Sequence, residues 1–166
     1  MDRRQIAIKL VLGALGLPVK LSTFDDRLIM QKVIYLAQAA GVRLGYYYRW
    51  YLRGPYCPSV TDDAFEVENV PNPASVFKGW ALDDGSVEKL RNLTPLLKKP
   101  RHELASHLEL LASIHFLIDR RQVSRPQPEA VTRALQAAGK PFNVHHVKAA
   151  MAEMRQYGLI AKVGAK

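Results

Sequence analysis

The stretch Tyr46–Leu52, with the sequence YYYRWYL, is the clearest β-strand signal in the chain, and it is short. Aromatic residues favour strands, and successive side chains of a strand point to opposite faces. Alternation predicts an apolar face and a mixed face: Tyr46, Tyr48, Trp50 and Leu52 on the first, and Tyr47, Arg49, Tyr51 and Arg53 on the second. We expect the first face in the core, the second as a candidate contact face, and Gly54-Pro55 as the end of the strand.

Elsewhere the apolar residues recur mostly at the three- and four-residue intervals of helices. Five helices are predicted before the C-terminal part: about 3–15, from Ser22 or Thr23 to Gly41, about 58–68, one capped by Asp83 or Asp84, and a long one that opens at Pro100. A short second strand near 76–82 could pair with the first. The predicted fold class is therefore mainly α with a small β element (α+β), a helical domain with a short β-hairpin.

The last forty residues read as a unit of their own. The segment EAVTRALQAAG predicts a helix that ends at Gly139, Asn143 caps a second helix that ends at Gly158, and LIAKV resembles a short strand. This outline is that of a winged helix-turn-helix, although any helical hairpin closed by a strand has the same outline. We expect one compact domain over 1–166, with a possible division into a helical core, 1–123, and a winged-helix-like unit, 127–166.

Positive charge is concentrated in the second half of the chain. Residues 1–97 carry 12 Lys or Arg against 10 acids, and residues 98–166 carry 12 against 5, so the second half holds +7 of the net +9. A basic half is typical of a protein with an anionic partner, although it also suits a merely soluble surface. The candidate nucleic-acid contacts lie on or beside the second C-terminal helix and, for the last of them, in the expected strand: Lys140, His145, His146, Lys148, Arg155 and Lys162.

Little in the sequence indicates catalysis or a cofactor. His102 and His107 of HELASH lie five residues apart, so they miss a common helix face, and no metal site is expected there. The acids at 62, 63, 66 and 68 are expected to face water at the start of a helix. Cys57 is expected to be unreactive, with a small enzyme built on Cys57 and a distant histidine as the open alternative. We therefore expect a non-enzymatic protein without cofactor or metal.

Membrane association is not predicted. No apolar run approaches the roughly 18 to 20 residues that span a bilayer. The first 20 residues imitate a signal peptide, but Asp2 and Lys9 favour an amphipathic helix over a targeting segment. A single cysteine cannot form an intrachain disulfide, which is consistent with the cytoplasm.

Two segments together resemble a known family. LIMQKVIYLAQAAG, followed by YYYRWYLRGPYCPSVTDDAF, is similar to the core signature of the Panacea antitoxin domain and of the SocA-like and YwgA-like bacterial and phage proteins. The resemblance covers about 24–66, with a looser likeness in HLELLASIHFL and the GLI near the end, and it departs from the family pattern at Met30 and Cys57. The matching positions are Gln31, Lys32, Tyr35, Leu36, Trp50, Gly54, Pro55, Tyr56, Val60 and Asp63.

The resemblance implies a mostly helical domain that acts by binding, since Panacea-type proteins neutralise partner toxins. We therefore expect an antitoxin-like protein-interaction module that binds a partner protein, which could be a toxin. A winged-helix protein that binds nucleic acid, or a regulatory protein of that type, is the alternative. The candidate partner-binding residues are Gln31, Lys32, Tyr35, Tyr47, Arg49, Tyr51, Arg53 and Tyr56.

Overall fold

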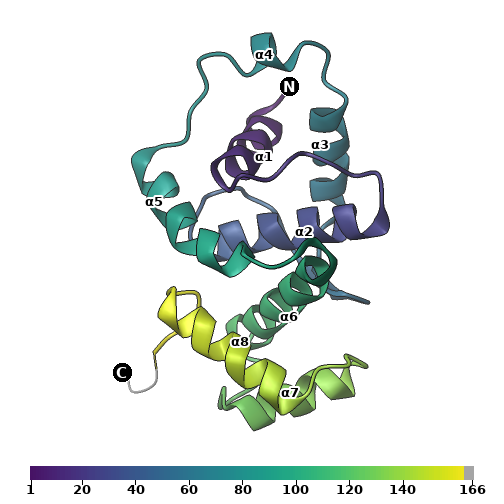
Figure 1. Ribbon diagram of the computed structural model, residues 1–166, viewed down its shortest axis with the longest axis vertical. Coiled ribbons are helices and arrows are strands. Elements are labelled where there is room, and N and C mark those ends of the chain that lie inside the picture. The colour runs from purple at the N-terminus through teal and green to yellow at the C-terminus, as the bar shows by residue number, and fades with distance from the viewer. Residues whose placement is uncertain (163–166) are drawn as a thin grey trace.

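A computed structural model describes residues 1–162 and shows a mostly helical chain with one small antiparallel sheet (Figure 1). The prediction of a mainly α fold with a small β element is thus confirmed. The elements follow in this order: α1 Arg3–Ala14, α2 Phe24–Ala39, β1 Arg49–Tyr51, β2 Gly54–Tyr56, α3 Pro58–Glu68, α4 Pro73–Val76, α5 Asp84–Leu93, η1 Thr94–Leu97 (a 3-10 helix), α6 Arg101–Asp119, α7 Pro128–Ala137 and α8 Val144–Gln156.

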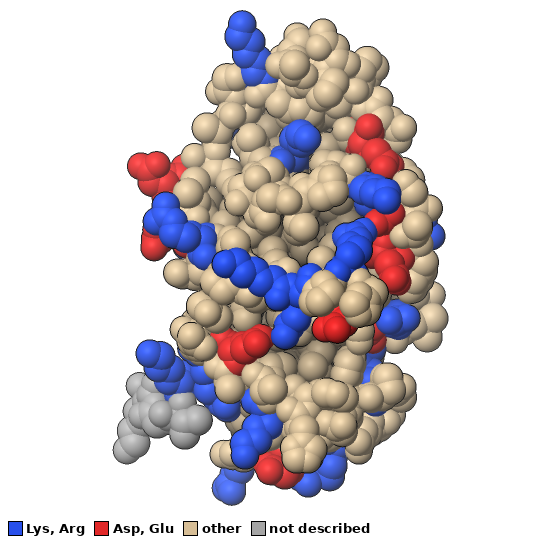
Figure 2. Space-filling model, in the orientation of Figure 1, with Lys and Arg blue, Asp and Glu red and all other residues tan. Residues whose placement is uncertain are grey.

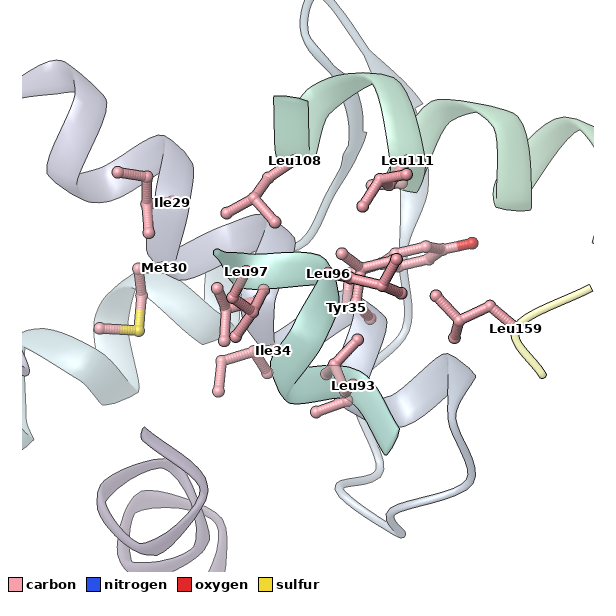
Figure 3. Close-up of a cluster of buried hydrophobic side chains, with 14 of the residues drawn as sticks. Ile29, Met30, Ile34, Tyr35, Leu93, Leu96, Leu97, Leu108, Leu111 and Leu159 are labelled. Atoms are coloured by element: carbon pink, nitrogen blue, oxygen red, sulfur yellow. The ribbon is translucent and has the colours of Figure 1, made fainter. Parts of the chain in front are cut away.

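Helix α6 is the central packing element of the described residues. It packs against α2 on one side and against α7 and α8 on the other (Figure 1). Buried side chains of α2, α5, η1 and α6 meet in one cluster, which Leu159 joins from the C-terminal segment (Figure 3). The two predicted units therefore share one hydrophobic core within the described residues.

Helix starts follow the side chains that can cap them. The Thr23 hydroxyl accepts from the N–H of Asp26 at 3.1 Å, and the Asp26 carboxylate accepts from the N–H of Thr23 at 3.1 Å. Asp83 accepts from the N–H of Ser86 at 2.9 Å, and Asn143 caps α8 in the same way through His146. These side chains satisfy backbone donors that a helix leaves unpaired at its N-terminus, which confirms the three predicted starts.

The hairpin differs from the predicted one. Strands β1 and β2 pair in antiparallel register, with Arg49 opposite Tyr56. Strand β1 ends at Tyr51, and Gly54-Pro55, expected only to stop that strand, begins β2. The second strand expected near 76–82 is absent, because Val76 ends α4 and residues 77–82 contain no strand. Pro55 is tolerated because a two-stranded sheet has only edge strands, where the missing N–H can face away from the partner strand.

The predicted alternation holds up to the hairpin turn. Tyr46 and Tyr48 are buried and Trp50 is half-buried, whereas Tyr47, Arg49 and Tyr51 are exposed. The expectation that Leu52 is core is wrong, because Leu52 lies in the turn and is 78% exposed. Alternation applies only while the chain stays extended, and the turn breaks it.

The C-terminal unit is a helical hairpin, as predicted, with α8 following a tight turn after Gly139. Residues 159–162 form no strand, so the wing expected from LIAKV is absent from the part of the chain that the structure describes; Val163 lies outside it. No helix within residues 1–162 is both long and apolar enough to cross a membrane.

Candidate functional site

The β-hairpin is fixed to α2 by a buried glutamine. The Gln31 amide nitrogen donates to the carbonyl of Cys57 at 2.7 Å and to the hydroxyl of Thr61 at 2.8 Å. Its amide oxygen accepts from the N–H of Cys57 at 3.1 Å. Gln31 thus fixes the backbone where β2 passes into α3. Its side chain is buried, so it is not the exposed contact residue that the sequence predicted.

A buried lysine on the next position of α2 holds the second strand. The Lys32 ammonium donates to the carbonyl of Pro55 at 2.5 Å, and the side chain is only 1% exposed. Burial lowers the pKa of Lys32 to about 7, while the nearby Glu109 carboxylate opposes this shift. Lys32, like Gln31, is therefore not an exposed contact residue.

Glu109 of α6 forms ion pairs with basic side chains from two distant segments. One carboxylate oxygen accepts from Nε of Arg53 at 2.5 Å, and the other accepts from Nζ of Lys140 at 2.8 Å. The Lys140 ammonium also donates to the carbonyl of Leu52 at 3.2 Å and lies 5.3 Å from the centre of the Trp50 ring. The α7–α8 loop therefore supports the hairpin turn through Lys140. Because Lys140 is buried, it is not exposed as the predicted nucleic-acid contact would need to be.

Gly54 meets a steric requirement in the hairpin. Its φ is +83°, a region that residues with a Cβ rarely adopt. A Cβ at this position would also lie 2.4 Å from the hydroxyl oxygen of Ser113 on α6. The glycine lets the hairpin backbone lie directly on α6, next to Glu109.

Tyr35 faces the interior between α2 and α6. Its hydroxyl is hydrogen-bonded to Nδ1 of His115 at 2.7 Å, and its ring packs edge-on against Tyr48 at 4.9 Å. Burial raises the pKa of the Tyr35 hydroxyl and lowers that of the His115 imidazole, so both groups are neutral at pH 7. Tyr35 borders a polar pocket of about 220 Å³ but does not join the exposed residues of the hairpin.

Several large side chains are exposed together around the hairpin. Tyr47 is 65% exposed, Tyr51 60% and Leu52 78%, and Phe24 at the start of α2 is 55% exposed. With Arg49 they form a surface of five residues that we call the hairpin face: Phe24, Tyr47, Arg49, Tyr51 and Leu52. Exposed apolar side chains that gather in this way mark binding surfaces more often than scattered ones do.

A groove and a pocket adjoin the hairpin face. The groove, about 720 Å³, is lined by four of the predicted hairpin contacts, Tyr47, Arg49, Tyr51 and Tyr56. Arg4, which the sequence did not single out, also lines it. The pocket, about 340 Å³, lies between α2 and the hairpin turn and is bordered by Phe24, Leu28, Lys32, Tyr51 and Leu52. The fifth predicted hairpin contact, Arg53, also borders this pocket, although its guanidinium is already paired with Glu109.

The candidate nucleic-acid contacts are divided by the fold. His145, His146 and Lys148 are exposed on the first turns of α8, and Lys162 is exposed after it. Arg155 is half-buried and donates to the carbonyl of Pro126 at 3.4 Å. Lys and Arg side chains also lie across the upper helices of the face shown in Figure 2, so positive surface charge is not confined to the C-terminal unit.

Two candidate chemistries can be compared with the structure. Cys57 is buried, and within residues 1–162 its thiol makes no hydrogen bond to a histidine. No three His, Cys, Asp or Glu side chains of the described residues gather where they could hold a metal ion. The expectation that all four acids of α3 face water is wrong for Asp63, which is buried and accepts from the Tyr46 hydroxyl at 2.7 Å.

Sequence reasoning did not identify Glu109 as the centre of the charge cluster. A signal was present in the sequence, because Glu109 interrupts the apolar run of HLELLASIHFL with leucines on both sides. A charged residue within a buried helix face needs a partner of opposite charge. The identity of its partners, 31 and 56 residues away, was not readable from local pattern.

Comparisons of the chain with protein-family models, with curated proteins and with solved structures found no match.

Proposed function

We propose that the chain is a non-enzymatic, antitoxin-like protein-interaction module that binds a partner protein through the hairpin face. The observation that carries the proposal is the exposure of Tyr47, Tyr51 and Leu52 on a hairpin whose backbone is held by buried polar contacts. Aromatic residues and arginine are enriched among the residues that dominate binding energy at protein interfaces. The resemblance of the LIMQKVIYLA and GPYCPSV segments to the Panacea domain supports the same role.

The anchoring of the hairpin supports binding on energetic grounds. Gln31, Lys32 and Lys140 each hold a backbone group of the hairpin or of its exit. A segment that is already ordered loses less conformational entropy when it binds, so more of the contact energy contributes to affinity. The net charge of +9 and the exposed guanidinium of Arg49 favour a partner with an acidic surface.

The proposal is tested by recovering the native complex. The tagged chain is expressed in its natural host and purified with and without nuclease, and the Tyr51→Ser/Leu52→Ser variant is compared with wild type. We expect a stoichiometric protein partner that survives nuclease and binds the variant at least about tenfold more weakly. Trp80→Ser, which removes an exposed aromatic ring elsewhere, is the matched control and should bind like wild type.

Three outcomes would overturn this function. They are the recovery of no protein partner, a partner that binds the double variant as tightly as wild type, and material that is lost on nuclease treatment. If the recovered partner is a growth-inhibiting protein, co-expression of the wild-type chain should restore growth, and the double variant should fail to do so. We place the protein in the cytoplasm as part of the proposal, because its one cysteine is a free thiol.

A second candidate function is nucleic-acid binding through α8. The observation that favours it is the exposure of His145, His146 and Lys148 on the second helix of a helical hairpin, the position of a recognition helix. A shift of duplex DNA at micromolar protein should then weaken as salt rises, and Lys148→Gln should reduce the salt slope by about one unit. Binding without salt dependence would exclude this function.

A further inference from the structure

The pocket between α2 and the hairpin turn combines apolar walls with a buried cation. Phe24, Leu28 and Leu52 supply apolar surface, and Lys32 borders the pocket from α2. The volume of about 340 Å³ is at the lower end of the range typical of ligand pockets, so it suits a group the size of one or two side chains. Apolar walls alone would indicate only an apolar ligand. The charged groups beside the pocket therefore determine which further group the ligand carries.

The charges around Lys32 do not balance. Three nearby charges shift the pKa of the Lys32 ammonium: the carboxylate of Glu109 raises it, and the cations Arg53 and Lys140 lower it. Glu109 is already hydrogen-bonded to both of those cations, one on each oxygen. Two buried lysines and the half-exposed Arg53 thus share one buried acid, and uncompensated buried charge is costly unless an anion or deprotonation relieves it.

Of the two buried lysines of the cluster, Lys32 has more unused donors. A lysine ammonium has three N–H groups, and within residues 1–162 that of Lys32 has one acceptor, the carbonyl of Pro55. Lys140, by contrast, donates to both Glu109 and Leu52. Burial lowers the pKa of Lys32 to about 7, so the group is partly neutral at pH 7 and would gain its proton beside a bound anion.

We propose that this pocket binds an apolar group that carries a carboxylate, presented by the partner protein as an acidic side chain beside an apolar one. The apolar walls would cover the hydrocarbon, and the carboxylate would supply the missing negative charge at Lys32. The pocket adjoins the hairpin face and shares Phe24, Tyr51 and Leu52 with it, so one partner segment can contact both. This inference rests on the proposed function and specifies the chemistry of the partner.

The first experiment needs neither the partner nor a variant. The isotope-labelled wild-type chain is titrated with hexanoate and, separately, with hexanamide, which has the same hydrocarbon and no charge, while amide chemical shifts are recorded. We expect saturable shifts at Phe24, Leu28 and Leu52 with hexanoate, and binding of hexanamide weaker by about tenfold or more, because charge-assisted hydrogen bonds to the carboxylate are lost. Equal binding of the two probes, or no saturable shift at these residues, would overturn the proposal.

Two variants then assign the effect to Lys32. Lys32→Met keeps the length of the side chain and should lose the preference for hexanoate. Lys89→Met is the matched control, because the Lys89 ammonium also donates to a backbone carbonyl, that of Gly41 at 2.9 Å, but lies outside the pocket. It should bind hexanoate as wild type does, and loss of the preference in both variants would count against a specific site.

The partner assay separates this inference from the proposed function. Hexanoate, but not hexanamide, should compete with the captured partner for the wild-type chain. If a partner binds through the hairpin face and hexanoate does not displace it, the proposed function stands and the partner's carboxylate is not in the pocket. If no partner binds at all, the proposed function fails, while the titration still shows whether the pocket itself accepts a carboxylate.

Discussion

The ammonium of Lys140 lies 2.8 Å from a carboxylate oxygen of Glu109, and both side chains are buried although the residues are 31 positions apart. Through this pair the α7–α8 loop reaches the centre of the molecule and supports the hairpin turn. The contact links the C-terminal helical hairpin, where the sequence predicted nucleic-acid contacts, to the β-hairpin, where it predicted contacts with a protein partner.

Removing the charge of Glu109 should destabilise the fold. Glu109→Gln leaves Lys32, Arg53 and Lys140 without a buried counter-charge, so we expect the free energy of unfolding to fall by about 3 to 5 kcal/mol, measured in urea. Glu88→Gln is the control, because Glu88 pairs with Arg91 in water and should change stability by about 0.5 kcal/mol or less. Similar effects of the two changes would mean that the Glu109 cluster does not hold the hairpin.

Gly54→Ala should be destabilising for two separable reasons. The positive φ costs about 1 to 2 kcal/mol for any residue with a Cβ, and contact with the Ser113 hydroxyl adds to this. Gly45→Ala isolates the first cost, because Gly45 has a φ of +75° and open space around its Cβ position. Adding Ser113→Ala to Gly54→Ala should restore part of the lost stability, and no restoration would show that the close approach to α6 is unimportant.

The buried Lys32 predicts a particular dependence of stability on pH. Its pKa is about 7 in the folded chain against an ordinary 10.5, so between these values the unfolded chain binds the additional proton. The contribution of Lys32 to the free energy of unfolding therefore rises with pH above about 7, by at most about 1.4 kcal/mol per pH unit. Urea unfolding from about pH 7 to about pH 9 should show a smaller rise for Lys32→Met than for wild type. Lys89→Met should keep the wild-type rise, and the same rise in Lys32→Met would contradict the assignment.

The two arginines of the hairpin should behave differently when each is replaced by glutamine. Arg49 is exposed and forms no ion pair within the described residues, so its loss should change the free energy of unfolding by about 0.5 kcal/mol or less. Arg53 donates to the buried carboxylate of Glu109, and its loss should cost about 1 to 3 kcal/mol. Partner affinity should fall with Arg49→Gln while stability is retained, and a large loss of stability with Arg49→Gln would make this residue part of the fold.

Most helices could be predicted from the sequence because their determinants are local. Thr23, Asp83 and Asn143 cap helices whose hydrogen-bond partners lie three residues away. The second strand was placed wrongly because Gly-Pro usually interrupts regular structure, whereas here Gly54 supplies the positive φ at which β2 begins. The close approach of Gly54 to Ser113, which leaves no room for a Cβ, is a long-range relationship that no local pattern reports.

The candidate site was predictable only on its exposed side. Tyr47, Arg49 and Tyr51 followed from strand alternation, which depends on the backbone alone. Gln31, Lys32 and Tyr35 were expected on the surface because such polar residues are usually exposed, yet α2 is enclosed by α6, α3 and β2. Their burial depends on partners far along the chain, such as His115 and Pro55, which only the folded structure identifies.

Lys140 has a consequence for how the molecule could be regulated. Its ammonium is bonded to the hairpin turn at Leu52, while its backbone belongs to the short link before the exposed residues His145 and His146. If a ligand bound to α8 displaces Lys140, the hairpin turn loses this hydrogen bond. Any change in affinity at the hairpin face that results must be matched, by linkage, by an equal factor at α8 when the hairpin face is occupied.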